Sequence, residues 1–220
     1  MFGGRKKRPK TEADAEREAR QLGRLQTLID VVFALLIVRI LTLMPDPTGV
    51  TWTGRKDLLD FLAAHSERFE IILVGTVFIL IYWAQNNKTF GNLRRTDGTH
   101  AALSIIQIVL LLLYFYFMRM GVEFKGDIAS LFFQSVFLAL AGFAGVAAWS
   151  YALKDRRLLS ESITDFEARE LRFNVMSEPI TALFTIPFAW IGPGWWTLAW
   201  LANILVSRLL KRRLPEEETA

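Results

Sequence analysis

Long apolar windows alternate with short polar connections along this chain. The first four windows lie near residues 25–44, 70–87, 98–118 and 128–153. Each is close to the roughly 20 mostly apolar residues that a helix needs to cross about 30 Å of hydrocarbon. The first window is interrupted by Asp30 and Arg39, whereas the second, between Glu70 and Lys88, carries no charge. The pattern therefore predicts four membrane-spanning helices in the first 153 residues.

The last apolar run, from Pro179 to Ser207, is too long to be a single span. The segment Ile191-Gly-Pro-Gly194 lies inside it, and Pro and paired Gly favour a turn over a continuous helix. We therefore expect a fifth span near 173–191 and a sixth near 194–210. A soluble protein with buried helices is the alternative, but windows of spanning length that recur between polar connections disfavour it.

These windows predict an all-α fold, a six-transmembrane-helix integral membrane bundle. The expected regions are a basic cytoplasmic N-terminal segment (1–21), the six-helix transmembrane domain (22–211) and a cytoplasmic tail (212–220). Shorter elements are expected around the spans: a cytoplasmic helix at 11–22, a helix on the outer surface within 51–66, and a cytoplasmic connector at 155–171.

The distribution of Lys and Arg predicts the orientation of the bundle. With six spans, 20 of these residues fall at the termini and in the second and fourth loops, and 5 fall on the opposite side. Loops rich in Lys and Arg stay in the cytoplasm. The sequence therefore predicts a multi-pass protein of the cell membrane with both termini in the cytoplasm.

Composition narrows the chemistry further. The formal net charge is only +4, which gives no reason to expect a nucleic-acid partner. The chain has no Cys and two His, so disulfides, thiol catalysis and a Cys- or His-rich metal centre are not expected. Gly-rich phosphate loops, nucleophile elbows and zinc-binding helix motifs are missing from the sequence. We therefore expect no catalytic residue, no metal and no cofactor, and a protein that is not an enzyme.

The informative residues are the polar ones within spans, because ionisable groups in hydrocarbon cost several kcal/mol and usually face protein or water. Asp30 lies five residues inside the first apolar window, and Arg24 precedes it by six residues, a spacing that places the two on different faces of one helix. Two interpretations stay open for Asp30: a structural tie to neighbouring spans, or a direct role in transport. Glu178, before Pro179, is expected to be a helix-start carboxylate or a partner for Arg24.

Two segments carry a resemblance to a known family. The stretch Arg24-Leu-Gln-Thr-Leu-Ile-Asp30 is similar to the Arg-x-x-x-Phe-Ser-Asp signature of the endosomal–lysosomal potassium channel family (transmembrane protein 175) and its bacterial relatives, with Leu28 and Ile29 for Phe and Ser. The end of span two, with Trp83, Asn86, Asn87 and Phe90, is similar to the family's Trp-x-x-His-His-x-x-Phe segment. Gln107 stands near the family's usual Asn in span three.

The resemblance implies a six-span subunit that assembles as a homotetramer in the lipid bilayer, with span one lining a pore for monovalent ions. It also implies a packing network of polar groups between spans one, two and three. By that mapping, the network residues of this chain are Arg24, Asp30, Trp83, Asn86, Asn87 and Gln107.

The family's pore positions map onto Leu35, Arg39 and Thr42. On a helix these residues lie at about 140°, 180° and 120° from Asp30, in one narrow stripe. Leu35 fits an apolar constriction, and Thr42 fits a wider, wetted mouth. Arg39 departs from the family, because a ring of guanidinium groups repels cations unless the side chain snorkels outward or pairs with Asp46.

The sequence therefore predicts the pore-forming subunit of a potassium-type monovalent cation channel. Two alternatives stay open. One is a membrane assembly or sensor protein of the same fold in which Arg39 blocks cations, and the other is an anion-permeable variant.

Overall fold

The fold is described from a computed structural model, which describes residues 12–48 and 51–212. Of the predicted terminal segments 1–21 and 212–220, the parts at positions 1–11 and 213–220 lie outside the described residues. In chain order the elements are α1 (Glu12–Leu41), α2 (Arg55–Ala64), α3 (Ser66–Gly91), α4 (Gly98–Glu123), α5 (Ile128–Leu153), the 3₁₀ turn η1 (Lys154–Arg156), α6 (Asp165–Thr185), the 3₁₀ turn η2 (Ile186–Trp190), α7 (Pro193–Ala199) and α8 (Ala202–Lys211).

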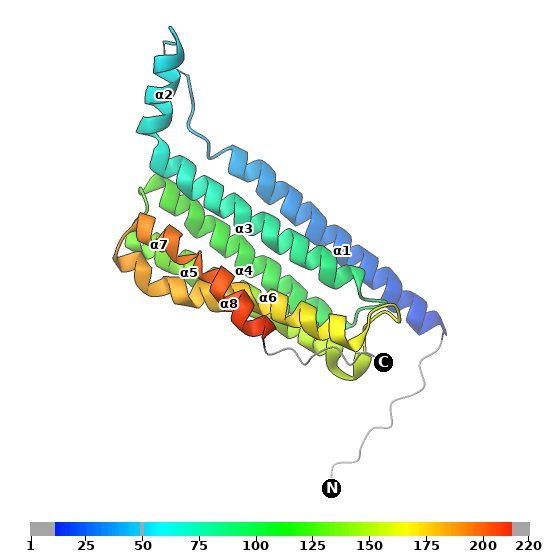
Figure 1. Cartoon of the computed structure of the whole chain (residues 1–220). Helices are drawn as coiled ribbons and strands as arrows, with labels where there is room; N and C mark the ends of the chain where they lie inside the picture. Colours follow the sequence, from blue (N-terminus) through cyan, green and yellow to red (C-terminus); the bar gives the residue numbers. More distant parts are fainter. Residues whose placement is uncertain (1–11, 49–50, 213–220) are drawn as a thin grey trace.

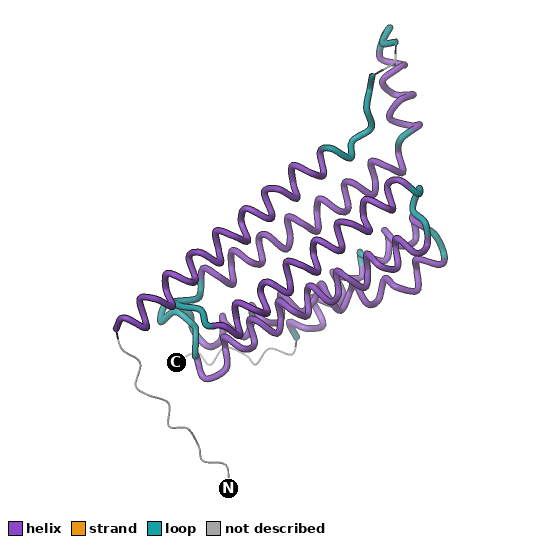
Figure 2. The backbone as a smooth tube through the Cα atoms, turned by 180° about the vertical axis from the view of Figure 1, so that it is seen from behind, coloured by secondary structure: helices purple, strands orange, loops and turns teal. Residues whose placement is uncertain are grey.

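The long helices lie side by side in an elongated bundle (Figure 1). α5 is the central element, because it packs on both α4 and α6, and α6 in turn packs on α8. α1 lies at the edge and packs mainly on α3 and α4; the view from behind shows the same position (Figure 2). α2 projects beyond the end of the bundle, and none of its residues is buried. The all-α class predicted from the sequence is confirmed.

Polar caps set where the long helices begin. The Asp97 carboxylate accepts a hydrogen bond from the His100 amide at 3.0 Å and starts α4, and Asp127 does the same for Ala129 at the start of α5. Thr164 and Glu167 form a reciprocal capping box that starts α6. Such caps satisfy the amides that the first helical turn leaves without partners. Each helix start therefore lies in a polar connection, as the alternation of windows requires.

Three of the described helices are long and apolar enough to cross a membrane: Arg68–Gly91, Gly98–Glu123 and the helix from Ile128 to Arg156. They correspond to the predicted second, third and fourth spans. α1 is also long, but it carries Asp30 and Arg39. The six-span count therefore stays a prediction for the first, fifth and sixth spans.

The chain near the last two predicted spans is less regular than a simple pair of helices. α6 starts at Asp165, eight residues before the predicted fifth span, and η2 continues it as a 3₁₀ turn. Gly192, with a φ of 137° that favours glycine, separates η2 from α7 at the predicted break. The final segment is divided into α7 and α8.

Two short predicted elements also differ from the structure. Residues 12–22 are the first turns of α1, so they do not form the separate cytoplasmic helix expected at 11–22, and the predicted boundary between residues 21 and 22 falls inside α1. No Pro or helix-breaking turn separates the charged turns from the apolar ones, so the helix continues. The short helix expected within 51–66 is α2.

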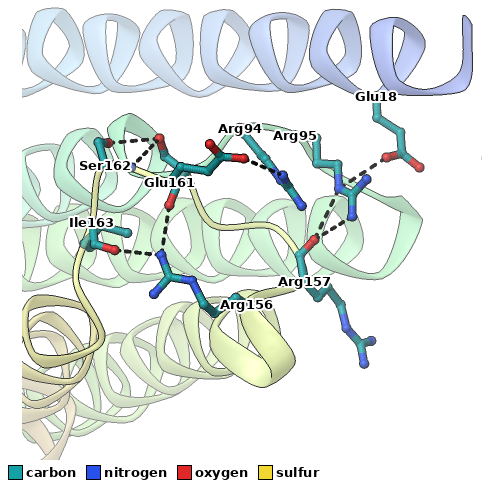
Figure 3. A network of polar contacts seen from close by, with 9 residues as sticks. Glu18, Arg94, Arg95, Arg156, Arg157, Glu161, Ser162 and Ile163 are labelled. Carbon is teal, nitrogen blue, oxygen red and sulfur yellow. Dashed lines mark hydrogen bonds and ion pairs between the residues drawn. The ribbon is translucent and has the colours of Figure 1, made fainter. Parts of the chain in front are cut away.

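Arginines hold α1 to the bundle near both of its ends. Near its start, Arg95 lies 3.5 Å from the Glu18 carboxylate and donates at 2.9 Å to the carbonyl of Arg157, so one guanidinium joins α1 to both loops at that end (Figure 3). Near its other end, Arg68 on α3 donates at 2.9 Å to the carbonyl of Leu43, just after α1. We call these contacts the Arg95 clasp and the Arg68 clasp.

The two loops beside the Arg95 clasp also bond to each other. The Arg94 amide donates to the carbonyl of Leu158 at 3.0 Å, and the Ser160 amide donates to Asn92 at 2.9 Å. Arg156 donates to the carbonyl of Ile163 at 2.7 Å, which folds the connector before α6 (Figure 3). The loop between α3 and α4 and the connector between α5 and α6 are therefore joined by hydrogen bonds at this end of the bundle.

The Arg95 clasp should contribute more stability than its neighbour. Arg95→Ala removes a charged donor whose side chain is 23% exposed, so we expect a loss of about 1.5–3 kcal/mol in the free energy of unfolding. Arg94→Ala is the matched control, because the ion pair of the Arg94 side chain is with the solvent-exposed Glu161 carboxylate at 3.7 Å, a contact worth less than about 1 kcal/mol, and the Arg94 amide bond to Leu158 is kept. Equilibrium unfolding in mixed detergent micelles measures the free energy of unfolding of both variants and of the wild type. Equal losses would contradict the clasp.

Candidate functional site: the outward face of α1

α1 has one buried face. Its buried side chains recur every three or four residues: Leu22, Leu25, Ile29, Phe33, Leu36 and Ile40. This spacing places them on one side of the helix, where they join the main hydrophobic cluster of the bundle. The seam continues to Leu43, beside the Arg68 clasp. α1 is therefore oriented about its own axis by this seam and fixed near its ends by the two clasps.

The opposite face of α1 is apolar and unpacked in the single subunit. Its side chains Leu28, Val31, Leu35, Val38 and Leu41 are each 50–62% exposed. Of the predicted pore residues, Leu35 lies in the middle of this face, and Arg39 and Thr42 are also exposed. We call this surface the α1 outer stripe. It faces lipid, another copy of the chain or a water-filled path.

Arg39 and Thr42 lie where α1 ends. The Thr42 hydroxyl donates at 2.6 Å to the carbonyl of Arg39, and the Thr42 and Leu43 amides bond three residues back, so the helix tightens into a turn. Asp46 accepts the Thr48 amide at 2.8 Å, a hydrogen bond that lowers the pKa of this carboxyl. Within residues 12–48 and 51–212, Arg39 forms no ion pair, so the contact with Asp46 is not made.

The two signature residues of α1 lie apart from the buried seam. Arg24 is exposed, and Asp30 is half-buried between buried Ile29 and exposed Val31. Neither side chain has an ion pair or hydrogen bond with another residue in the described part of the subunit. Arg24 also does not contact Glu178, which lies inside the bundle. The alternative that pairs Glu178 with Arg24 is therefore wrong.

The other predicted network residues divide between surface and interior. Trp83 is 42% exposed, whereas Asn86 and Gln107 are buried and line one partly open cavity of about 20 Å³. His100 and Ser104 of α4 line the same cavity, which is large enough for about one water molecule. Asn86 donates to the Tyr82 carbonyl at 2.9 Å, and Asn87 is partly buried beside it. The structure brings Asn86 and Gln107 together, but not with Arg24 or Asp30.

Charge is concentrated at the end of the bundle that holds the Arg95 clasp. The Lys and Arg residues in the first turns of α1, the end of α3 with the loop after it, the connector between α5 and α6, and the first turns of α6 are Arg17, Arg20, Lys88, Arg94, Arg95, Lys154, Arg156, Arg157, Arg169 and Arg172. Burial raises the pKa of Asp97 in this cluster, but hydrogen bonds from the His100 amide and the Tyr151 hydroxyl outweigh it and hold that pKa below its usual value. In residues 12–48 and 51–212, no group of three or more His, Cys, Asp or Glu side chains is placed to hold a metal ion.

Sequence reasoning missed two features that position this site. The Arg95 clasp joins residues 77 positions apart, and the sequence carries no signal for their pairing. Glu178 was expected at a helix start, but it lies within α6, where its carboxylate contacts the Tyr82 hydroxyl. The helix starts earlier because the Thr164 capping box, not Pro179, provides its first turn.

The fold matches a known channel structure. No protein-family model and no curated protein sequence matches the chain. A search of solved structures finds the crystal structure of a lysosomal potassium-selective channel TMEM175 homologue from Chamaesiphon minutus, with a TM-score of 0.65 and 15% identity. The match covers 87% of this chain and 98% of that one. This chain has the fold of the TMEM175 homologue. The resemblance read from the sequence is therefore confirmed at the level of the fold.

Asp30 provides a test of whether the TMEM175-like subunit is complete on its own. A half-buried carboxylate within an apolar stretch needs a partner, and the described subunit provides none. We expect that partner in a neighbouring copy, so Asp30→Ala should weaken assembly by about 1 kcal/mol or more, which changes the ratio of assembled to free subunits about fivefold.

Size-exclusion chromatography with multi-angle light scattering in mild detergent measures that ratio. Asp60→Ala, which removes an exposed carboxylate on α2, is the control. If Asp30→Ala assembles as well as the wild type and its ion flux changes, Asp30 faces the water of a permeation path instead.

Proposed function

We propose that this chain is a divergent member of the TMEM175 family and the pore-forming subunit of a potassium-type monovalent cation channel. Its fold over most of both chains is that of a protein described as a potassium-selective channel homologue. We further propose a homo-oligomer, with four copies as the expected number, in which six spans per subunit cross the cell membrane.

The observation that carries this proposal is the α1 outer stripe. A helix that faces only lipid would place Arg39 in or near hydrocarbon, which costs several kcal/mol for an ionisable group. A helix that faces an axial path gives Arg39 and Thr42 water, and it gives Leu35 a copy of itself across the axis. Because the buried seam fixes the rotation of α1, these three residues point away from their own subunit.

Each of the three predicted pore residues then has a proposed role. Leu35, 59% exposed in the subunit, forms an apolar constriction that controls passage by dewetting. Thr42, seven residues or about 10 Å further along in the turn that ends α1, lines a wetted mouth. Arg39 lies between them, and a ring of its guanidinium groups lowers the entry rate of cations. The proposed channel is therefore a weak conductor of potassium.

Arg39 also favours a second candidate function. Its exposure and the lack of an ion pair in residues 12–48 and 51–212 leave its positive charge uncompensated in the subunit. With such a ring the same fold serves as a non-conducting assembly or sensor protein, or it passes anions in preference to cations. The ion selectivity of the purified protein distinguishes these functions from the first.

Flux in liposomes tests the proposed function. Purified protein is reconstituted with gradients of potassium, sodium or chloride, and the flux of each ion is measured. We expect slow potassium flux for the wild type and at least a tenfold increase for Arg39→Leu, which corresponds to a barrier lower by about 1.4 kcal/mol. Arg55→Leu, which removes an exposed charge on α2, is the control and should leave the flux unchanged.

An unchanged potassium-to-chloride permeability ratio in Arg39→Leu, with the oligomer intact, would remove Arg39 from the permeation path. Chloride flux in the wild type that exceeds potassium flux would support the anion-permeable alternative. If neither the wild type nor Arg39→Leu conducts any of the three ions, the non-conducting assembly is favoured.

The proposed orientation has its own test. The basic end of the bundle should face the cytoplasm, because retained loops are rich in Lys and Arg. The chain has no Cys, so single cysteines report position directly. We expect Lys56→Cys on α2 to react with a membrane-impermeant maleimide in intact cells, and Arg17→Cys and Lys211→Cys to react only after permeabilisation. Labelling of either of these two in intact cells would contradict the orientation.

A further inference from the structure

Glu178 is the most deeply buried acidic side chain in the described structure, with 2% of its surface exposed. It lies in α6, and its Oε2 contacts the hydroxyl of Tyr82 on α3. Its other oxygen, Oε1, is buried and has no hydrogen-bond partner in the described residues. An ionised carboxylate in this position would carry an uncompensated charge in the interior of an apolar bundle, which is the costly case for a buried group.

A count of protons around Tyr82 indicates the protonation state of Glu178. The Tyr82 hydroxyl donates at 2.8 Å to the carbonyl of Leu138 and also contacts Glu178 Oε2. A tyrosine hydroxyl has one proton, and a carbonyl or an ionised carboxylate can only accept. Two hydrogen bonds among these three oxygens need two protons. A proton on Glu178 Oε2 supplies the second one, with the Tyr82 oxygen as its acceptor.

No cation replaces that proton among the residues around Glu178. The titratable groups that face it are the hydroxyls of Tyr82 on α3 and Tyr114 on α4, both fully buried. α5 presents the Leu138 carbonyl and Gly142. On the α8 side the polar contact is that of Asn203 with Thr181, at 3.1 Å. Within the described residues, no Lys, Arg or His forms an ion pair with Glu178.

The bundle is built to hold the two side chains together. A Cβ on Gly142 would lie 2.8 Å from the Tyr82 hydroxyl and 2.9 Å from Glu178 Oε2, so only glycine leaves room for their contact. Tyr114 is also buried, and its hydroxyl has no partner in the described residues.

We propose that Glu178 is a proton-binding site inside each subunit. The bound proton stays on Oε2 and forms a hydrogen bond to the Tyr82 oxygen, and the Tyr82 hydroxyl donates its own hydrogen bond to the Leu138 carbonyl. The site therefore keeps α3, α5 and α6 joined by a neutral chain of hydrogen bonds. It is separate from the α1 outer stripe, and the inference does not rest on the proposed channel function.

Infrared spectroscopy tests the proton directly. The wild type minus Glu178→Gln difference spectrum at pH 7 should contain the C=O band of a protonated carboxylic acid, and that band should shift in protein labelled with ¹³C-glutamate. The glutamine amide keeps a neutral donor toward Tyr82, so this variant is expected to fold. A difference spectrum with carboxylate bands only would overturn the proposal.

The pH dependence of stability is the second measurement. In the folded state Glu178 keeps its proton, whereas in the unfolded state it ionises above about pH 4.3, as an exposed glutamic acid does. The stability of the folded state therefore falls as pH rises above that value. The unfolding equilibrium constant of the wild type should therefore rise with pH relative to Glu178→Gln, by up to about tenfold per pH unit for one proton. Glu70→Gln, which changes an exposed acid on α3, is the control and should follow the wild type.

If Glu178→Gln and the wild type have the same pH dependence of unfolding, the folded state holds no extra proton at this site and the proposal is wrong. If Glu178→Gln does not fold, Tyr82→Phe replaces it: removal of the acceptor should move the acid band of the otherwise intact protein. A band that stays in place in Tyr82→Phe would also overturn the proposal. Neither measurement involves ion flux, so failure here leaves the proposed function standing.

Discussion

The structure depends on one constraint: hydrocarbon supplies no hydrogen-bond partners, so polar groups on the long helices must find partners in the protein or lie at its ends. Arg68 and Arg95 lie at the two ends of the bundle, where each guanidinium reaches a carbonyl as well as a carboxylate. Glu178 lies inside and contacts Tyr82. The same requirement therefore accounts for the arginine clasps at the ends and for the proposed chain of hydrogen bonds through a neutral Glu178 in the middle.

The α1 helix is the part of the subunit that does not satisfy this constraint alone. Its buried seam is complete, but Asp30 and Arg39 have no ion-pair partner in the described residues, and the outer stripe is apolar and exposed. α5, in contrast, is packed on both of its sides by α4 and α6. An assembly of several copies around the α1 outer stripes would satisfy these groups, because it supplies both protein contacts and a wetted path at the same surface.

Much of the fold could be predicted from the sequence, because the apolar windows have the length of a span and the caps lie in the polar connections between them. The break at Gly192 was visible for the same local reason. Contacts between distant segments could not be predicted: Tyr82 and Glu178 are 96 residues apart. The six-residue spacing of Arg24 and Asp30 pointed to the family, yet spacing on one helix cannot show which neighbouring side chains these residues reach.

The two proposals meet at α3, because this helix packs on α1 and also carries Tyr82 toward Glu178. α1 is held to its neighbours by an apolar seam, which tolerates small shifts, and by clasps at its ends, which are directional. If Glu178 lost its proton, the single proton of Tyr82 would face two acceptors, and one of the two contacts would have no hydrogen bond. Gly142 leaves the room that both side chains occupy on the α5 side, and the helix that brings Tyr82 to this contact is the one on which α1 packs.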